Sequence, residues 1–205
     1  MADNTDTQVR AKVWLRPEQI DALRSACYDV GADYLQQRNE AMIALMYDTG
    51  VRVGELVALD VEHLRDGNTA LYMPTAIQKD YPTDSSPPPA TLDLASDVSR
   101  LLSSYLTNRW KDSPALFPSR SSSRITTQGV RDALRKVAIA AGVRPYLLDG
   151  SRGEPGDVTP HALRHSVAYR MMNAEEGNEL YDVRNRLRHR SITTTEQVYD
   201  HIIRV

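Results

Sequence analysis

An imidazole and a guanidinium lie one turn apart at the start of an expected helix. Thr159 is a suitable N-cap and Pro160 fits the first helical position, so His161 and Arg164 share one face of that helix. Because the free N–H groups at a helix start add positive potential, this pair is suited to binding an oxyanion such as phosphate. A single His-x-x-Arg pattern is common and identifies no site on its own.

A second guanidinium follows a helix-breaking glycine. Arg52 comes directly after Gly50-Val51, and Glu55 lies three residues further on. Alone, this spacing predicts a solvated ion pair on a helix, which stabilises the helix by only about 0.3 kcal/mol. Arginine also suits phosphate binding, because its planar guanidinium donates two parallel hydrogen bonds.

An imidazole and a phenol are separated by a threonine-rich segment near the end of the chain. His189 precedes this segment and Tyr199 follows it. Thr193 and Glu196 form a capping-box pattern, which predicts that a helix begins there and carries Tyr199 in its second turn. A helical tyrosine near a C-terminus is most often a packing residue, so the phenol alone does not indicate a nucleophile.

The order of these groups closely resembles that of the tyrosine recombinase or phage integrase family. The chain carries Arg-x-x-Glu-Leu after Thr-Gly, then a lysine between two expected strands, then His-x-Leu-Arg-His, and finally Leu-x-His before a Thr-rich turn and a tyrosine. The resemblance covers roughly Pro17 to His201, which is the catalytic domain of that family. The lysine is Lys79. Its assignment rests on its position alone, since no other lysine lies between Lys12 and Lys111.

The resemblance implies a site-specific recombinase or integrase that cleaves and rejoins DNA strands. Arg52 and Arg164 would hold the non-bridging oxygens of the scissile phosphate and stabilise the extra charge of the transition state. His189 would donate a hydrogen bond to the same phosphate. The catalytic residues would therefore surround one phosphodiester, although they are far apart in the sequence.

The same resemblance implies a covalent step. Tyr199 would attack the phosphorus with His161 as its proton acceptor, and Lys79 would protonate the departing 5′-hydroxyl. The resulting 3′-phosphotyrosyl linkage keeps the bond energy, so we expect no ATP, metal ion or other cofactor. The sequence also has no carboxylate cluster of the kind that two-metal nucleases use.

The chain departs from the family pattern at both ends and near the nucleophile. About fifteen residues precede the first expected helix, where family members usually carry a separate helical domain that completes a DNA clamp. The chain ends six residues after Tyr199, and the ten-residue step from His189 is one longer than usual. We therefore expect a free monomer that oligomerises on double-stranded DNA, with an accessory DNA-binding protein as the candidate source of the missing clamp.

Two alternatives remain open. The first is a non-catalytic DNA-binding protein derived from a recombinase. The second is a metal-dependent nuclease or metal-binding module built from His161, His165, His189 and His201. It ranks lower, because histidines at i,i+4 need a further ligand, and no cysteine or paired carboxylate offers one.

The periodicity of apolar residues predicts an α+β fold that is mainly α-helical, with a small antiparallel sheet. Strands are expected at 70–73 and 91–94, separated by a proline-rich connection. Residues 1–15 are predicted to be a flexible tail, residues 16–205 the catalytic domain, and residues 143–158 a loop. Helices are expected from Pro17, over 33–48, from Val98 to Trp110, over 130–142, from Thr159 past Met171, over 180–187, and around Tyr199.

The composition limits the possible partners and the cellular location of the protein. The 205 residues include 25 basic and 27 acidic side chains, and this net charge of −2 neither supports nor excludes a nucleic-acid partner. A single cysteine rules out an internal disulfide, and no apolar run is long enough to span a membrane, so we expect a cytoplasmic protein. The scarcity of lysine and the abundance of aspartate are typical of proteins from salt-loving or high-GC organisms, and a haloarchaeon or its virus is the suspected source.

Overall fold

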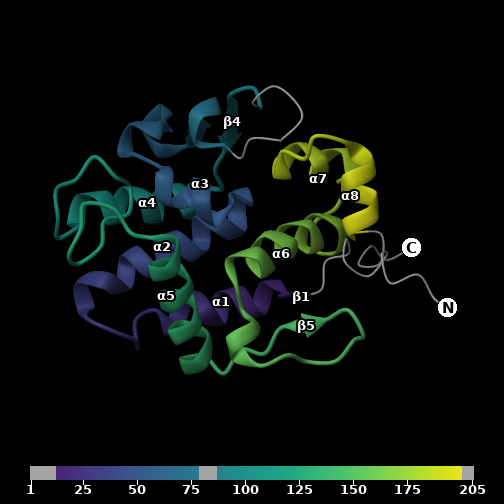
Figure 1. Cartoon of the computed structure of the whole chain (residues 1–205), viewed down its shortest axis with the longest axis horizontal. Helices are drawn as coiled ribbons and strands as arrows, with labels where there is room; N and C mark the ends of the chain where they lie inside the picture. Colours follow the sequence, from purple (N-terminus) through teal and green to yellow (C-terminus); the bar gives the residue numbers. More distant parts are fainter. Residues whose placement is uncertain (1–12, 79–86, 200–205) are drawn as a thin grey trace.

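Helices α2 and α6 lie in the middle of the structure, and the remaining elements pack around them (Figure 1). The computed structural model describes residues 13–78 and 87–199. Its strands are β1 (Val13–Trp14), β2 (Leu64–Arg65), β3 (Ala70–Met73), β4 (Ala90–Asp93) and β5 (Tyr146–Leu147). Its α-helices are α1 (Pro17–Ala26), α2 (Asp33–Thr49), α3 (Val53–Ala58), α4 (Ser96–Asn108), α5 (Thr127–Ala140), α6 (Pro160–Asn173), α7 (Leu180–Leu187) and α8 (Ile192–Tyr199).

Helix α2 is buried on nearly all sides in its second half. The run from Ala41 to Met46 is at most 3% exposed, and it contacts α1, α4 and α6 on different faces. A helix that is apolar all round is stable only where other elements surround it. Within the described ranges, no helix combines the length and apolarity that crossing a bilayer requires.

A three-stranded antiparallel sheet lies at one end of the structure, in the strand order β2, β3, β4. Leu71 pairs with Leu92 in its register, and both side chains are buried in the main core. The expected strand at 70–73 is confirmed, and the expected strand at 91–94 begins and ends one residue earlier. Within the connection between them, residues 79–86 lie outside the described residues.

A second sheet was not predicted. Val13 and Trp14 of β1 pair antiparallel with Leu147 and Tyr146 of β5, inside the segment predicted to be a loop. Leu15 is fully buried, and its amide donates a hydrogen bond of 2.8 Å to the Ser166 hydroxyl. The prediction of a flexible tail is therefore wrong for residues 13–15, because strands of two residues are too short to show alternation; residues 1–12 lie outside the described residues.

The sequence predicted the start of α6 correctly and the start of α8 incorrectly. The Thr159 hydroxyl accepts a hydrogen bond of 3.2 Å from the Ala162 amide, which confirms it as the N-cap of α6. The predicted capping box at Thr193 is wrong, because α8 already begins at Ile192. The Ser191 hydroxyl instead accepts a hydrogen bond of 3.4 Å from the Thr194 amide.

Gly50 ends α2 in a conformation and a space that suit only glycine. Its φ is +66°, and a Cβ atom built there would lie 2.4 Å from Cδ2 of Leu187. Leu187 is fully buried and cannot move away freely. The chain therefore makes a tight turn here, directly before Arg52, with α7 packed against it.

Gly50→Ala is expected to lower the free energy of unfolding more than Gly142→Ala, measured by urea denaturation. Gly142 also has a left-handed φ of +59°, but a Cβ atom there would meet nothing within 4 Å. The control should lose about 1 kcal/mol from backbone strain, whereas Gly50→Ala should lose about 1–3 kcal/mol more from overpacking. Equal losses in the two variants would show that α7 does not press on this turn.

Candidate active site

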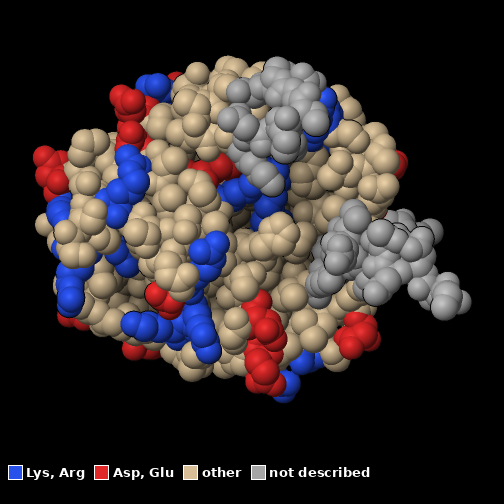
Figure 2. Space-filling model, in the orientation of Figure 1, with Lys and Arg blue, Asp and Glu red and all other residues tan. Residues whose placement is uncertain are grey.

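An open, positively charged pocket lies where the turn before α3 meets the start of α6. Arg52, His161 and Arg164 line this pocket of about 330 Å³, together with Arg131 of α5 and Thr159. Figure 2 shows basic side chains gathered in a hollow between the regions of α3 and α7. The pocket is suited to an anion, because guanidiniums from separate elements converge on it.

Arg164 is the most buried of these cations, with 3% of the residue exposed. Its guanidinium donates hydrogen bonds to the carbonyl oxygens of Gly50 and Leu187. Burial, and then the charge of Arg52, lowers the pKa of Arg164 to about 9, which leaves it charged at neutral pH. Because both carbonyls are neutral, they fix the direction of the guanidinium without cancelling its charge.

Arg52 is the N-cap residue of α3 and is tied to Glu55. Its amide donates a hydrogen bond of 2.7 Å to Glu55 Oε2, and its Nη1 donates one of 3.0 Å to Oε1. Glu55 is 2% exposed, so the pair is not the solvated one that its spacing suggests. Burial alone would raise the pKa of Glu55, but Arg188, the Arg52 amide and the Arg52 guanidinium together hold it below its usual value.

Tyr199 lies beside the pocket, in a cluster of imidazoles. Its hydroxyl is 3.1 Å from Nδ1 of His165, and its ring stacks on that of His189 with the centroids 5.9 Å apart. The rings of His161 and His165 meet edge to face at 4.2 Å. Tyr199 is 1% exposed, and burial raises the pKa of its phenol to about 12, against the opposing effect of Arg164 and Arg52.

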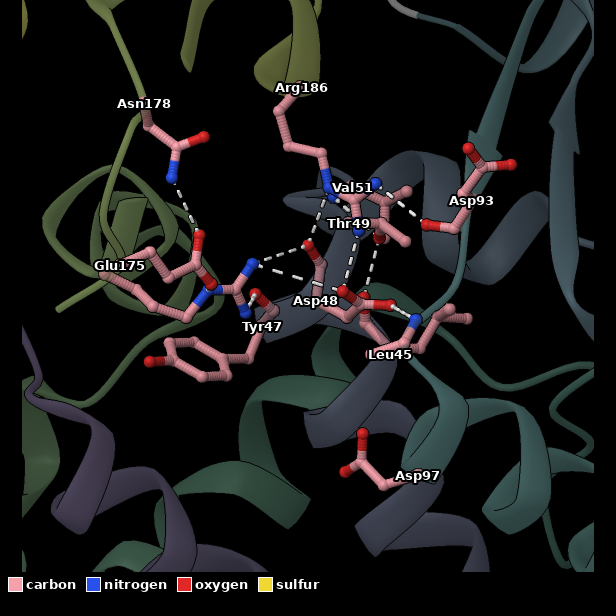
Figure 3. Close-up of polar contacts among 12 residues, drawn as sticks. Leu45, Tyr47, Asp48, Thr49, Val51, Asp93, Asp97, Glu175, Asn178 and Arg186 are labelled. Atoms are coloured by element: carbon pink, nitrogen blue, oxygen red, sulfur yellow. Dashed lines mark hydrogen bonds and ion pairs between the residues drawn. The ribbon is translucent and has the colours of Figure 1, made fainter. Parts of the chain in front are cut away.

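A polar network fixes α7, the helix that leads to His189. The Arg186 guanidinium donates to the side chain of Asp48 at 2.7 Å and to the backbone carbonyls of Asp48 and Asp93 at 3.0 and 2.8 Å. The second oxygen of the Asp48 carboxylate accepts from the Ala95 amide at 3.0 Å. Figure 3 shows Arg186 directed at this group of oxygens. The end of α7 is therefore held against both α2 and the strand β4.

The structure brings together five of the six residues that the sequence suggested, namely Arg52, His161, Arg164, His189 and Tyr199. Lys79 lies outside the described residues. His189 also forms a hydrogen bond of 2.9 Å with the hydroxyl of Thr195, which is fully buried.

Sequence reasoning missed several neighbours of these groups. His165, considered only as a metal ligand, is the imidazole in contact with the Tyr199 hydroxyl. Arg131 comes from an element whose local pattern gives no sign of a site, and Arg188 stands at the variable position of the Leu-x-His motif. Only their spatial neighbours assign these two arginines to the site. Within the described residues, no three histidine, cysteine or acidic side chains lie close enough together to hold a metal ion. His201 lies outside them.

The sequence matches the model of the phage integrase family over residues 13–204. It is 34% identical over 171 residues to tyrosine recombinase XerC of Herpetosiphon aurantiacus, covering 80% of this chain and 48% of that protein. It is 32% identical over 170 residues to tyrosine recombinase XerD of Oceanobacillus iheyensis, covering 82% and 51%. The chain thus spans about half the length of these relatives, which are bacterial and give no support to a haloarchaeal source.

The fold is similar to that of solved recombinase structures. The crystal structure of XerA recombinase superposes with a TM-score of 0.69 at 23% identity, covering 90% of this chain and 57% of that one. The Tn1549 transposon integrase in complex with transposon right end DNA gives a TM-score of 0.72 at 20% identity, covering 100% and 64%. The expectation of a mainly helical catalytic-domain fold with a small antiparallel sheet is confirmed.

Stability is expected to fall with acid because of His189. Burial, and then the charges of Arg164, Arg52 and Arg188, lowers the pKa of His189 from 6.5 to about 3. The unfolded chain therefore takes up a proton below about pH 6.5 that the folded chain refuses until about pH 3, so stability present above this window is lost as the pH falls through it.

His189→Gln removes this titration and serves as the comparison. Urea unfolding of both proteins at a series of pH values should show the parent chain losing stability relative to the variant by up to about 1.4 kcal/mol per pH unit between about pH 6 and pH 4. Parallel pH profiles for the two proteins would contradict the buried, neutral imidazole.

Proposed function

This chain belongs to the phage integrase family, and we propose that it is a tyrosine-type site-specific DNA recombinase. In this proposal it cleaves and rejoins strands of double-stranded DNA through a 3′-phosphotyrosyl intermediate. The observation that carries the proposal is the convergence of Arg52 and Arg164 on one pocket, with the phenol of Tyr199 beside it. Relatives that share at least 30% identity are named tyrosine recombinases.

The proposed cleavage step assigns each group near the pocket a role. Arg52 and Arg164 bind the non-bridging oxygens of the scissile phosphate and stabilise the negative charge that grows in the transition state. His189 adds a neutral hydrogen-bond donor, since its lowered pKa keeps it uncharged at neutral pH. Tyr199 forms the bond to phosphorus as the bond to the 5′-oxygen breaks, and Lys79 supplies the proton that this oxygen takes up.

We propose that the tyrosine changes its surroundings before it reacts. Its hydroxyl contacts His165, whereas the pocket is lined by His161. A phenol with a pKa of about 12 is a poor nucleophile at neutral pH, so it needs a base in contact with it. We propose that Tyr199 leaves the contact with His165 as it approaches the bound phosphate, and that His161 then accepts its proton.

The proposed partner is double-stranded DNA, on which the protein oligomerises, while the isolated chain is a monomer. Support comes from the similar fold of the Tn1549 transposon integrase, whose structure is a complex with transposon right end DNA. We further propose an accessory DNA-binding protein as a partner and a cytoplasmic location. A pocket lined by three arginines fits the phosphate backbone despite the net charge of −2.

Tyr199→Phe is expected to abolish covalent DNA capture, because it removes the attacking oxygen. The substrate is a pool of radiolabelled duplexes of random sequence, each nicked a few nucleotides downstream of the captured position, so that the released 5′-hydroxyl fragment diffuses away. The parent chain should form a labelled adduct in EDTA, and the variant should form none.

Tyr181→Phe is the matched control, because Tyr181 is also a helical tyrosine but is 58% exposed on α7. It should form as much adduct as the parent chain. A parent chain that binds the duplexes but never becomes labelled would favour the non-catalytic alternative, and an adduct that persists in Tyr199→Phe would assign the nucleophile elsewhere.

Lys79→Ala is expected to slow cleavage of an ordinary phosphodiester by about 10²–10⁴-fold, the usual contribution of a general acid. On a substrate with sulfur at the 5′-bridging position, the leaving thiolate needs no proton. The variant should therefore cleave that substrate at nearly the parent rate. Lys136→Ala, which changes an exposed lysine on α5, is the control. If sulfur does not restore cleavage by Lys79→Ala, another group is the general acid.

A further inference from the structure

Arg188 is a buried arginine in a strained backbone conformation. It directly follows α7 with φ 53° and ψ 47°, the left-handed region, which costs a residue with a Cβ atom about 1–2 kcal/mol. Its side chain is only 8% exposed. Glycine would avoid the strain and a neutral side chain would avoid the burial of charge. Such a combination of costs is typical of positions that serve a site.

The guanidinium of Arg188 is bound to Glu55. Its Nη2 donates a hydrogen bond of 2.6 Å to Glu55 Oε2, the oxygen that also accepts from the Arg52 amide. The other oxygen, Oε1, accepts from Arg52 Nη1. A single buried carboxylate is therefore shared between two guanidiniums.

The two arginines that share Glu55 differ in their access to the pocket. Arg52 lines the pocket together with Arg164, and its side chain is 26% exposed. Arg188 does not line it, and two of its nitrogens, Nε and Nη1, are buried without a hydrogen-bond partner among the residues that the structure describes. Arg188 thus contributes charge at the carboxylate and no contact surface in the pocket.

This arrangement determines which guanidinium neutralises the negative charge of Glu55. If Arg188 were absent, Arg52 would be the one cation left in an ion pair with the carboxylate among the described residues. A buried ion pair attracts strongly where water is excluded. Much of the charge of Arg52 would then be cancelled. With Arg188 in place, the carboxylate is neutralised by a guanidinium that does not line the pocket, and the charge of Arg52 remains available to an anion.

We propose that Arg188 is a positioning residue for the DNA cleavage proposed above, on which this inference rests. By neutralising Glu55, it keeps the charge of Arg52 free for the scissile phosphate while Glu55 still holds Arg52 in place. Arg188 acts through Glu55 and touches neither the phosphate nor the nucleophile.

The test is a double-mutant cycle between Arg188→Gly and Glu55→Gln, with two separate measurements. The first is the binding of inorganic phosphate to the free protein, followed by calorimetry. The second is the single-turnover rate of covalent capture on a nicked duplex recovered from the parent adduct. Glycine is chosen because it fits the left-handed backbone.

Arg188→Gly should weaken phosphate binding and slow capture by about tenfold or more, since each lost tenfold corresponds to about 1.4 kcal/mol. Adding Glu55→Gln to Arg188→Gly should restore most of the phosphate affinity and most of the capture rate, because it removes the negative charge that Arg188 neutralised. A merely structural role for Arg188 predicts the opposite, namely that the double variant is at least as impaired as the single one. Arg188→Lys should stay closer to the parent than Arg188→Gly.

The inference would be overturned if the phosphate affinity and the capture rate of Arg188→Gly lay within twofold of the parent values. It would also be overturned if the double variant bound phosphate and captured DNA no better than Arg188→Gly. If Arg188→Gly fails to fold, Arg188→Met replaces it in the same cycle, because it keeps the length of the side chain without the charge. The two measurements distinguish a failure of the inference about Arg188 from a failure of the proposed function. A parent chain that forms no adduct would refute the recombinase proposal, whereas the phosphate measurements would still decide the role of Arg188.

Discussion

The buried guanidinium of Arg164 is the interaction on which the rest of the site depends. It joins the turn at Gly50 to the end of α7 at Leu187 through two backbone carbonyls. Those two segments carry Arg52 on one side and His189 on the other. Since a buried charge is costly unless its donors are satisfied, the tertiary structure must keep both carbonyls in place. One side chain of α6 thereby sets the relative positions of the groups around the pocket.

An acidic group, Glu55, balances part of the positive charge at this pocket. The Glu55 carboxylate is shared between Arg52 and Arg188. Asp48 has a separate role, because it binds Arg186 and so holds α7 against α2. Burial, and then the excess of positive charge, lowers the pKa of His189, and the same charge opposes the rise that burial causes in the pKa of Tyr199. The electrostatics of the site therefore favour the binding of an anion and disfavour the binding of a cation.

Local signals predicted the helices well where periodicity was long or a cap was present. The start of α6 at Thr159-Pro160 is an example, because its N-cap hydrogen bond depends only on neighbours in the sequence. The start of α8 was misplaced, since Ser191 competes with Thr193 for the same role. The pairing of β1 with β5 was missed, because two-residue strands some 130 positions apart leave no periodic pattern.

The sequence by itself determined the types of the chemical groups, their order and the family that they indicate, because motif residues are set by the chemistry that they perform. Only the tertiary structure decided which imidazole meets the phenol, which carboxylate serves two guanidiniums, and that Arg188 belongs to the site at all. These outcomes depend on how α6, α7 and α8 pack against the turn at Gly50. Packing of that kind is fixed by long-range contacts, and residue spacing along a single element does not encode it.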